Sequence, residues 1–210
     1  MQLHRPAPWV GALILAASLV GSAQAQRISL APDVGVYIPT TELIAAASGE
    51  QFKQEIGMSF GGRFGLWFSN RVGVQLTGTY VPSDLRYSFT GGETTEDANL
   101  WFGSGRVSVA VIPVTSPVYV VLSGGVSVVG RSGTAYEGVE DRSDVGGVAG
   151  ATVGINLGPV SLFVNADDNV YKASFSGTTA VESKTQHDVN LSFGFGVPLG
   201  AGRKSGKELK

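Results

Sequence analysis

The residues best suited to catalysis lie around His187, near the C-terminus. Glu182, Ser183 and Ser192 lie within five residues of it. A serine nucleophile needs a base and an orienting acid within hydrogen-bond reach, so this group is a candidate for acyl transfer. Strand alternation, however, places His187 and Ser192 on opposite faces of the same segment. We therefore predict a rim or loop histidine, no catalytic residue and no enzymatic activity, with an enzyme as the alternative.

Two acidic clusters and the basic tail are the candidates for binding ions. Clusters at residues 93–97 and 137–144 carry carboxylates that could hold divalent cations, but they lack the spacing of an EF-hand. In the tail, Ala201 and Glu208 stand where a phosphate-binding loop needs glycine and Ser or Thr. We predict solvated loops, a solvated tail, no metal site and no cofactor.

Four charges stand out because they interrupt otherwise small, polar faces of alternating segments. They are Asp33, Arg63, Arg106 and Asp167, and three of them lie about five residues from a short turn or chain end. Two positive and two negative charges at similar depth predict an ionic network, with Asp33–Arg63 as the direct pair. Arg106 would reach Asp167 through water or a hydroxyl. The alternative is that water solvates each charge separately.

The elements that position these charges are strands of period two. In residues 57–80 (GMSFGGRFGLWFSNRVGVQLTGTY) one face is apolar without any charge, and the other is Gly, Ser, Thr and Gln with one arginine. An apolar outer face and a small, polar inner face are typical of a transmembrane β-barrel.

Eight segments carry this alternation, and each is long enough for a tilted membrane strand. The hairpin supplies two of them, at 60–68 and 72–80, and the other six are residues 28–38, 99–111, 118–129, 145–157, 160–171 and 187–197. The sequence therefore predicts an all-β fold, an eight-stranded antiparallel up-and-down transmembrane β-barrel.

The connections alternate in length, as expected of an outer-membrane barrel. Short turns at 69–71, 113–117 and 158–159 alternate with longer, polar loops at 40–54, 90–97, 131–144 and 177–186. Four aromatic residues fall near the segment ends and predict an interfacial girdle: Phe68 and Phe195 at the inner end, Tyr80 and Trp101 at the outer end.

The N-terminus predicts export. His4 and Arg5 precede an apolar run at residues 10–20, and Ala23-Gln24-Ala25 then provides a small-residue cleavage site. We therefore expect three parts: a secretory signal peptide at 1–25, the barrel at 26–199, and a polar basic tail at 200–210.

Composition limits the function classes further. Only 15% of the 210 residues are charged, 30 are glycine, and the net charge is −2. The slightly negative net charge predicts no nucleic-acid partner. The absence of cysteine excludes disulfides and thiolate metal sites.

Together, the signal peptide, the eight segments and the runs "FGGRFGLWFS" and "LSFGFGVPL" resemble the small OmpA/OmpX-type outer-membrane β-barrel family. The resemblance covers the predicted mature chain. It implies a bacterial outer-membrane location, contact with lipids and lipopolysaccharide, insertion by the barrel assembly machinery, and a monomer. The sequence departs from the family pattern in two ways. A polar tail follows the last predicted strand, where the family commonly ends on an aromatic residue, and we expect no peptidoglycan-binding domain of the kind that larger relatives carry.

The resemblance predicts a structural or surface-interaction role, in envelope stability and loop-mediated contacts. Some barrels of this kind modify lipid A, so a lipid A-modifying enzyme is one alternative. A narrow channel is another, although eight strands enclose an interior that side chains can fill. The closest rival for the fold is a secreted, lipocalin-like barrel with its apolar face turned inward.

Overall fold

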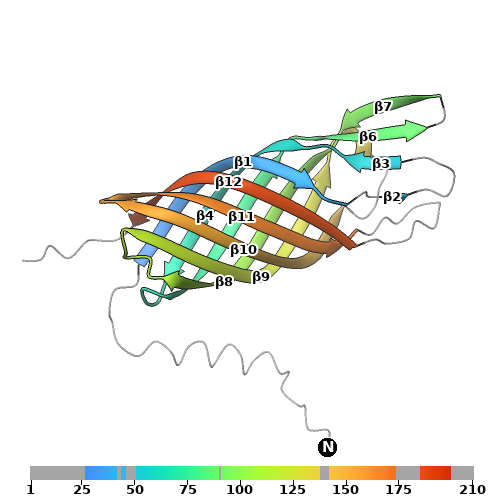
Figure 1. Cartoon of the computed structure of the whole chain (residues 1–210). Coiled ribbons are helices and arrows are strands. Elements are labelled where there is room, and N and C mark those ends of the chain that lie inside the picture. Colours follow the sequence, from blue (N-terminus) through green and yellow to red (C-terminus); the bar gives the residue numbers. More distant parts are fainter. Residues whose placement is uncertain are drawn as a thin grey trace, which may run out of the picture.

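The computed structural model describes residues 27–41, 44–45, 51–89, 91–137, 142–173 and 185–199. The predicted signal peptide and basic tail lie outside these residues. Eight of the strands close a barrel, and four shorter strands form a second sheet in the order β2-β3-β6-β7 (Figure 1). We call the barrel end that carries this second sheet the outer end.

The barrel strands pair antiparallel in chain order, and β1 closes the barrel by pairing with β12. Their bounds are β1 (Arg27–Pro39), β4 (Gly57–Trp67), β5 (Val72–Val81), β8 (Asn99–Ile112), β9 (Val118–Ser132), β10 (Ser143–Leu157), β11 (Val160–Lys172) and β12 (Thr185–Leu199). Seven of the predicted segments lie within these strands, and the eighth, 60–68, runs one residue past the end of β4 into the turn. The predicted fold class, an eight-stranded up-and-down barrel, is confirmed.

The barrel is apolar outside and polar inside. On β5, Leu76 is 62% exposed on the exterior. In the interior, Ser59, Asn165 and Asp167 are buried. A lipocalin-like barrel would bury the apolar face instead, so that rival is wrong. Burial of polar residues behind an exposed apolar wall is the arrangement that a lipid environment favours.

The second sheet corrects the prediction of plain loops at 40–54 and 90–97. These segments contain β2 (Ile44–Ala45), β3 (Gln51–Gln54) and β7 (Gly92–Asp97), and β6 (Asp84–Phe89) completes the sheet. The sequence did not predict β7 because this strand is polar on both faces. All six of its residues are exposed, so it shows no apolar alternation.

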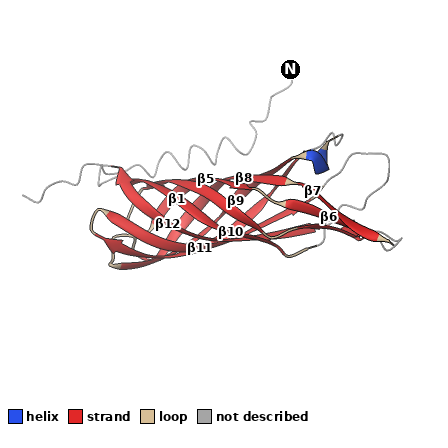
Figure 2. Ribbon diagram, turned by 90° about the horizontal axis from the view of Figure 1, so that it is seen from above, coloured by secondary structure: helices blue, strands red, loops and turns tan. Residues whose placement is uncertain are grey.

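The second sheet is an extension of the barrel wall. Val81 faces Leu100 in the barrel, and Asp84 faces Asp97 in the second sheet, so β6 and β7 keep the register of β5 and β8. Figure 2 shows β6 and β7 reaching beyond the barrel, with the short helix η1 (Thr134–Tyr136) near them. β3 also leads into β4, although the register changes by one residue between the β3–β6 and β4–β5 pairings. The second sheet therefore continues three barrel strands.

The inner end is made by short turns. In the turn after β4, Ser69 Oγ accepts hydrogen bonds from the backbone N–H groups of Arg71 and Val72, at 3.1 and 3.0 Å. Between β10 and β11, Gly158 has a φ of 79°, a conformation that glycine adopts without strain. These turns agree with the predicted inner connections.

The outer connections differ from prediction at 131–144 as well. Arg131 ends up in β9 and Asp144 in β10, and both side chains are buried inside the barrel rather than solvated. The predicted loop at 177–186 lies outside the described residues except for its last two positions, which belong to β12.

Candidate functional site

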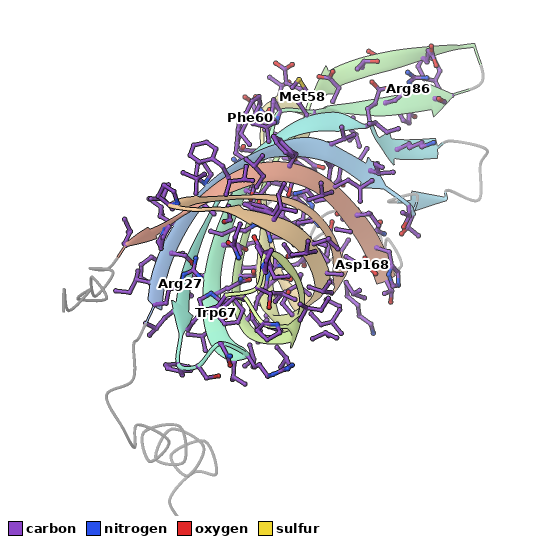
Figure 3. All side chains as sticks on the ribbon, turned by 60° about the vertical axis from the view of Figure 1, so that its left-hand side comes forward. Arg27, Met58, Phe60, Trp67, Arg86 and Asp168 are labelled. Atoms are coloured by element: carbon purple, nitrogen blue, oxygen red, sulfur yellow. The ribbon has the colours of Figure 1, made fainter. Side chains whose placement is uncertain are left out.

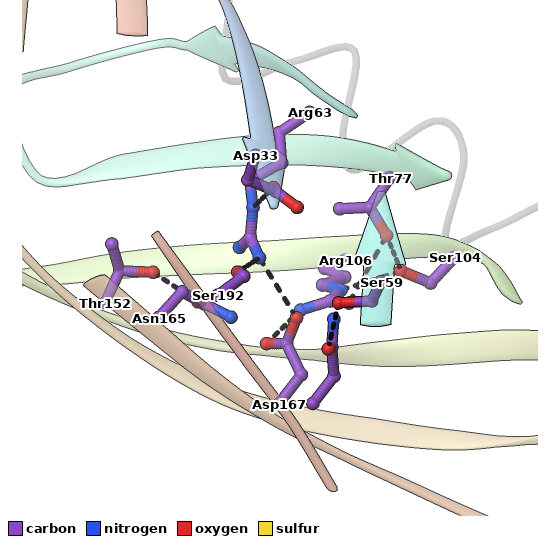
Figure 4. Close-up of polar contacts among 11 residues, drawn as sticks. Asp33, Ser59, Arg63, Thr77, Ser104, Arg106, Thr152, Asn165, Asp167 and Ser192 are labelled. Atoms are coloured by element: carbon purple, nitrogen blue, oxygen red, sulfur yellow. Dashed lines mark hydrogen bonds and ion pairs between the residues drawn. The ribbon is translucent and has the colours of Figure 1, made fainter. Parts of the chain in front are cut away.

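The structure brings the four predicted lumen charges together in one buried layer (Figure 4). Arg63 Nε donates to Asp33 Oδ2 at 2.8 Å, across the β1–β4 pairing. Arg106 Nη1 donates directly to Asp167 Oδ1 at 2.6 Å, where the sequence had predicted a mediated contact. Arg63 Nη2 also lies 3.3 Å from Asp167 Oδ2, so both pairs join into one network.

Hydroxyl groups complete the coordination of the two guanidinium groups. Ser192 Oγ accepts from Arg63 Nη2 at 3.2 Å, and Ser104 Oγ accepts from Arg106 Nε at 2.7 Å. Thr77 Oγ1 accepts from Arg106 Nη2 at 3.3 Å. These small polar residues add hydrogen bonds that help the inner face of the barrel to hold buried charges.

Two glycines provide room for the carboxylates. A Cβ atom at Gly61 would collide with Asp33 Oδ1, and one at Gly150 would collide with Asp167 Oδ1. Gly61 lies opposite Asp33 in the β1–β4 register, and Gly150 lies opposite Asp167 in the β10–β11 register. At these two positions the inner face therefore needs glycine, because a larger residue would displace a carboxylate of the charged layer.

One apolar cluster lies on the outer side of the charged layer and another on its inner side. The outer cluster consists of Tyr37, Val81, Leu100, Phe102, Val129, Tyr171 and Ala173. The inner cluster consists of Ala31, Trp67, Ala110, Val114, Tyr119, Val121 and Phe163. The lumen is thus layered, with apolar side chains on the outer and inner sides of the network.

Buried polar groups that the sequence did not predict lie beside the outer cluster. Arg131 Nη1 donates to Asp144 Oδ2 at 2.6 Å, and its guanidinium lies 5.5 Å from the ring centroid of Tyr171. The Tyr171 hydroxyl donates to Asp188 Oδ2 at 2.6 Å. Alternation could have found them, since Arg131 continues the inward positions of Ser127 and Val129, and Asp188 those of Asn190 and Ser192.

Tyr136 connects the helix η1 to the second sheet. Its hydroxyl donates to Gln54 Oε1 at 2.9 Å, and Gln54 Nε2 donates to the Ala98 carbonyl at 2.7 Å. Burial raises the pKa of Tyr136 to about 12, so its hydroxyl stays protonated and remains a donor. Through these two hydrogen bonds, Gln54 of β3 joins Tyr136 to Ala98, which directly precedes β8.

The four girdle residues lie on the exterior of the molecule. Phe68, Tyr80, Trp101 and Phe195 are all exposed. Tyr80 and Trp101 are direct neighbours on β5 and β8, with Phe60 beside Tyr80 on β4. The Trp101 ring covers Gly130, where an added Cβ would overlap it. The outer girdle is therefore a row of three aromatic residues.

His187 lies at the outer rim, on the exterior. Its Nδ1 is 3.0 Å from Asp168 Oδ2, and its backbone N–H donates to Thr41 Oγ1 at 3.0 Å. Ser192 is instead buried in the lumen beside Arg63. Glu182 and Ser183 lie outside the described residues. The structure therefore separates His187 from Ser192.

In the described ranges no three His, Asp or Glu side chains come close enough to hold a metal ion. No helix of those ranges has the length and apolarity to span a membrane.

The sequence matches no family model, and no curated protein is significantly similar to it. Solved structures match its shape. Outer membrane protein OprG of Pseudomonas aeruginosa is 13% identical, with a TM-score of 0.66, over 85% of this chain and 98% of OprG. Neisserial surface protein A is 17% identical, with a TM-score of 0.54, over 83% of this chain and 98% of that protein.

A third similar structure is outer membrane protein W of E. coli, which is 12% identical with a TM-score of 0.50 over 85% of this chain and all of that protein (100%). The chain has the fold of the small outer-membrane β-barrels. The apolar exterior and the girdle agree with the predicted location in a bacterial outer membrane, because such a barrel exposes an apolar band to lipid.

Proposed function

We propose that this small outer-membrane barrel has a structural and surface-contact role, with its second sheet as the contact element. The observation that carries the proposal is the continuous register from β5 and β8 into β6 and β7. A hairpin built in this way holds its outer part in a fixed position relative to the membrane. Such a rigid extension suits contacts outside the cell.

The chemistry of β7 supports this role. It is an edge strand of the second sheet, and its sequence GETTED is exposed at every position. An edge strand presents unpaired backbone groups that can pair with a strand of another protein. The carboxylates of Glu93, Glu96 and Asp97 favour a partner segment with positive charge.

The layered lumen makes a channel the less favourable proposal. The charged layer is enclosed by apolar clusters on both sides, and its four charges neutralise one another. An ion crossing this interior would have to displace direct ion pairs. We propose a closed lumen and a monomeric barrel in contact with outer-membrane lipids and lipopolysaccharide, inserted by the barrel assembly machinery.

The position of His187 argues for a protein without lipid A-modifying activity. Its side chain and that of Asp168 are half exposed, at 50% and 40%, on the outside of the barrel. A nucleophilic hydroxyl beside the free ring nitrogen is needed for acyl transfer. The serine nearest in the described sequence, Ser192, faces the lumen instead.

Shortening the β6–β7 hairpin tests the proposed role. We expect a variant in which a two-residue Asn-Gly turn replaces residues 84–97 to insert normally but to lose surface contacts. The turn would join β5 and β8 where Val81 faces Leu100, so the barrel pairing stays intact. The measurement is adhesion of cells that carry the variant to other cells and to matrix-coated surfaces.

A matched control keeps the hairpin and changes only its charge. Glu93→Gln/Glu96→Gln leaves the strand in place and should weaken adhesion only in part. The proposal fails if the shortened variant is inserted at the normal level and cells carrying it adhere as well as cells carrying the unaltered chain.

A further inference from the structure

The inner apolar cluster is incompletely packed and encloses a cavity of about 70 Å³. It lies at the barrel end opposite the second sheet, where Figure 3 shows Arg27 and Trp67. Phe163, Val121 and Tyr119 form apolar walls, and Gln75 and Ser161 add polar groups. Gln75 and Ser161 are only half-buried, so solvent reaches this part of the lumen from the inner end.

The cavity carries positive charge. Arg27 and Arg63 both line it, and none of its lining residues in the described ranges is acidic. Arg63 is neutralised by Asp33 and Asp167 at the top of the cavity. Arg27 makes no ion pair with a described residue, and its Nη1 donates to the Val114 carbonyl at 3.2 Å. Among the described residues, nothing therefore compensates its charge at the inner mouth.

A turn partly covers the entrance. Asn156 Nδ2 donates to the carbonyls of Val114 and Ser116, at 2.9 and 2.6 Å, and so holds residues 113–117 across the inner end. The buried side chain of Val114 then lines the cavity next to Arg27. This arrangement gives the cavity a fixed mouth with a cation at its edge.

We propose that this cavity binds a small organic carboxylate from the periplasmic side. The carboxylate would accept hydrogen bonds from the guanidinium of Arg27, and the short apolar body would lie against Trp67 and Phe163. A water molecule occupies roughly 10–15 Å³ on this scale, so the cavity has room for about five heavy atoms. Propionate has this size and this division between a charged end and an apolar end.

The test compares propionate with propionamide, a neutral molecule of the same shape. The readout is the chemical shift of the Trp67 indole N–H of the ¹⁵N-labelled barrel in micelles, at constant ionic strength. The signal is assigned with Trp67→Phe. We expect a saturable shift with propionate and little shift with propionamide, because only the anion makes charge-assisted hydrogen bonds.

Variants at two arginines distinguish binding in the cavity from a general electrostatic attraction to this end of the barrel. Arg27→Gln should weaken propionate binding by roughly ten- to a hundredfold, the effect expected for a lost hydrogen bond to a charged group. Arg27→Lys should restore part of the affinity. Arg71→Gln, which removes an exposed arginine at the same barrel end, should leave binding unchanged, because Arg71 donates to the carbonyls of Ala110 and Val111 outside the cavity.

Three results would overturn the proposal. They are the absence of a saturable shift, equal shifts with propionate and propionamide, and unchanged affinity in Arg27→Gln. Inorganic phosphate is tested alongside, and binding as tight as that of propionate would show that the apolar walls contribute nothing, which would contradict an organic ligand. None of these outcomes depends on the β6–β7 hairpin.

Discussion

Arg63→Ala is expected to lower the free energy of unfolding by about 3–5 kcal/mol, the range for breaking one side of a buried ion pair. The side chains of Asp33 and Arg63 are only 2% and 8% exposed, so the pair is largely shielded from water. Asp167 keeps its contact with Arg106, so Asp33 is the carboxylate left without a cation. The measurement is urea unfolding of the barrel in lipid vesicles.

The double change Asp33→Ala/Arg63→Ala should be less destabilising than Arg63→Ala alone, because it removes the stranded carboxylate as well. Arg86→Ala is the matched control. Arg86 of β6 is 48% exposed and pairs with Glu55, which follows β3, so its loss should cost about 1 kcal/mol or less. Strictly additive losses for Asp33→Ala and Arg63→Ala would show that the two side chains are not energetically coupled.

Leu76→Arg is expected to impair insertion, at a cost of about 2–4 kcal/mol for an arginine near the middle of the bilayer. Leu76 is 62% exposed on the exterior of β5, between Phe64 of β4 and Gly105 of β8. Its neighbours offer no carboxylate to compensate a charge. Folding yield into vesicles, measured by protease protection, reports the effect.

Thr94→Arg is the control for this experiment. Thr94 is exposed on β7, beyond the barrel, and the same arginine there should leave the folding yield unchanged. If Leu76→Arg folds as well as Thr94→Arg, the exterior of β5 does not face lipid.

Alternation was sufficient to predict the barrel because the membrane imposes it on every strand. In the strands of residues 57–80 the apolar positions lie outside and the small polar positions inside, except that the aromatic Trp67 faces inward and packs in the inner cluster. The same periodicity placed Asp33 and Arg63 on one face of neighbouring strands, and the structure puts them in direct contact. The predicted signal peptide stays a prediction, since residues 1–25 lie outside the described ranges.

The second sheet could not be predicted in the same way, and Arg131 and Asp144 are placed inside only if the alternation is extended beyond the predicted segments 118–129 and 145–157. Outside the membrane both faces of a strand meet water, so β7 carries no alternation and reads as a loop. Arg131 and Asp144 seemed solvated for the same reason, because charge at a strand end usually marks a loop. Their burial depends on pairing between β9 and β10, a contact that local sequence does not report.

The direct contact between Arg106 and Asp167 is a related case. The two residues are 61 positions apart and lie on strands that are not neighbours, so their side chains meet across the lumen. Alternation gives the face of each residue but not the distance across the barrel. Gly150, which leaves space for the Asp167 carboxylate, is part of what makes the direct contact possible.

This chain is a closed barrel in the outer membrane. The most direct test is the electrophoretic mobility, with and without boiling in SDS, of the chain recovered from fractionated cells. We expect the chain in the outer-membrane fraction, extracted only by detergent, and migrating faster unboiled than boiled because a closed barrel resists unfolding by SDS. Recovery as a soluble periplasmic monomer with one mobility would show that the chain is not an outer-membrane barrel.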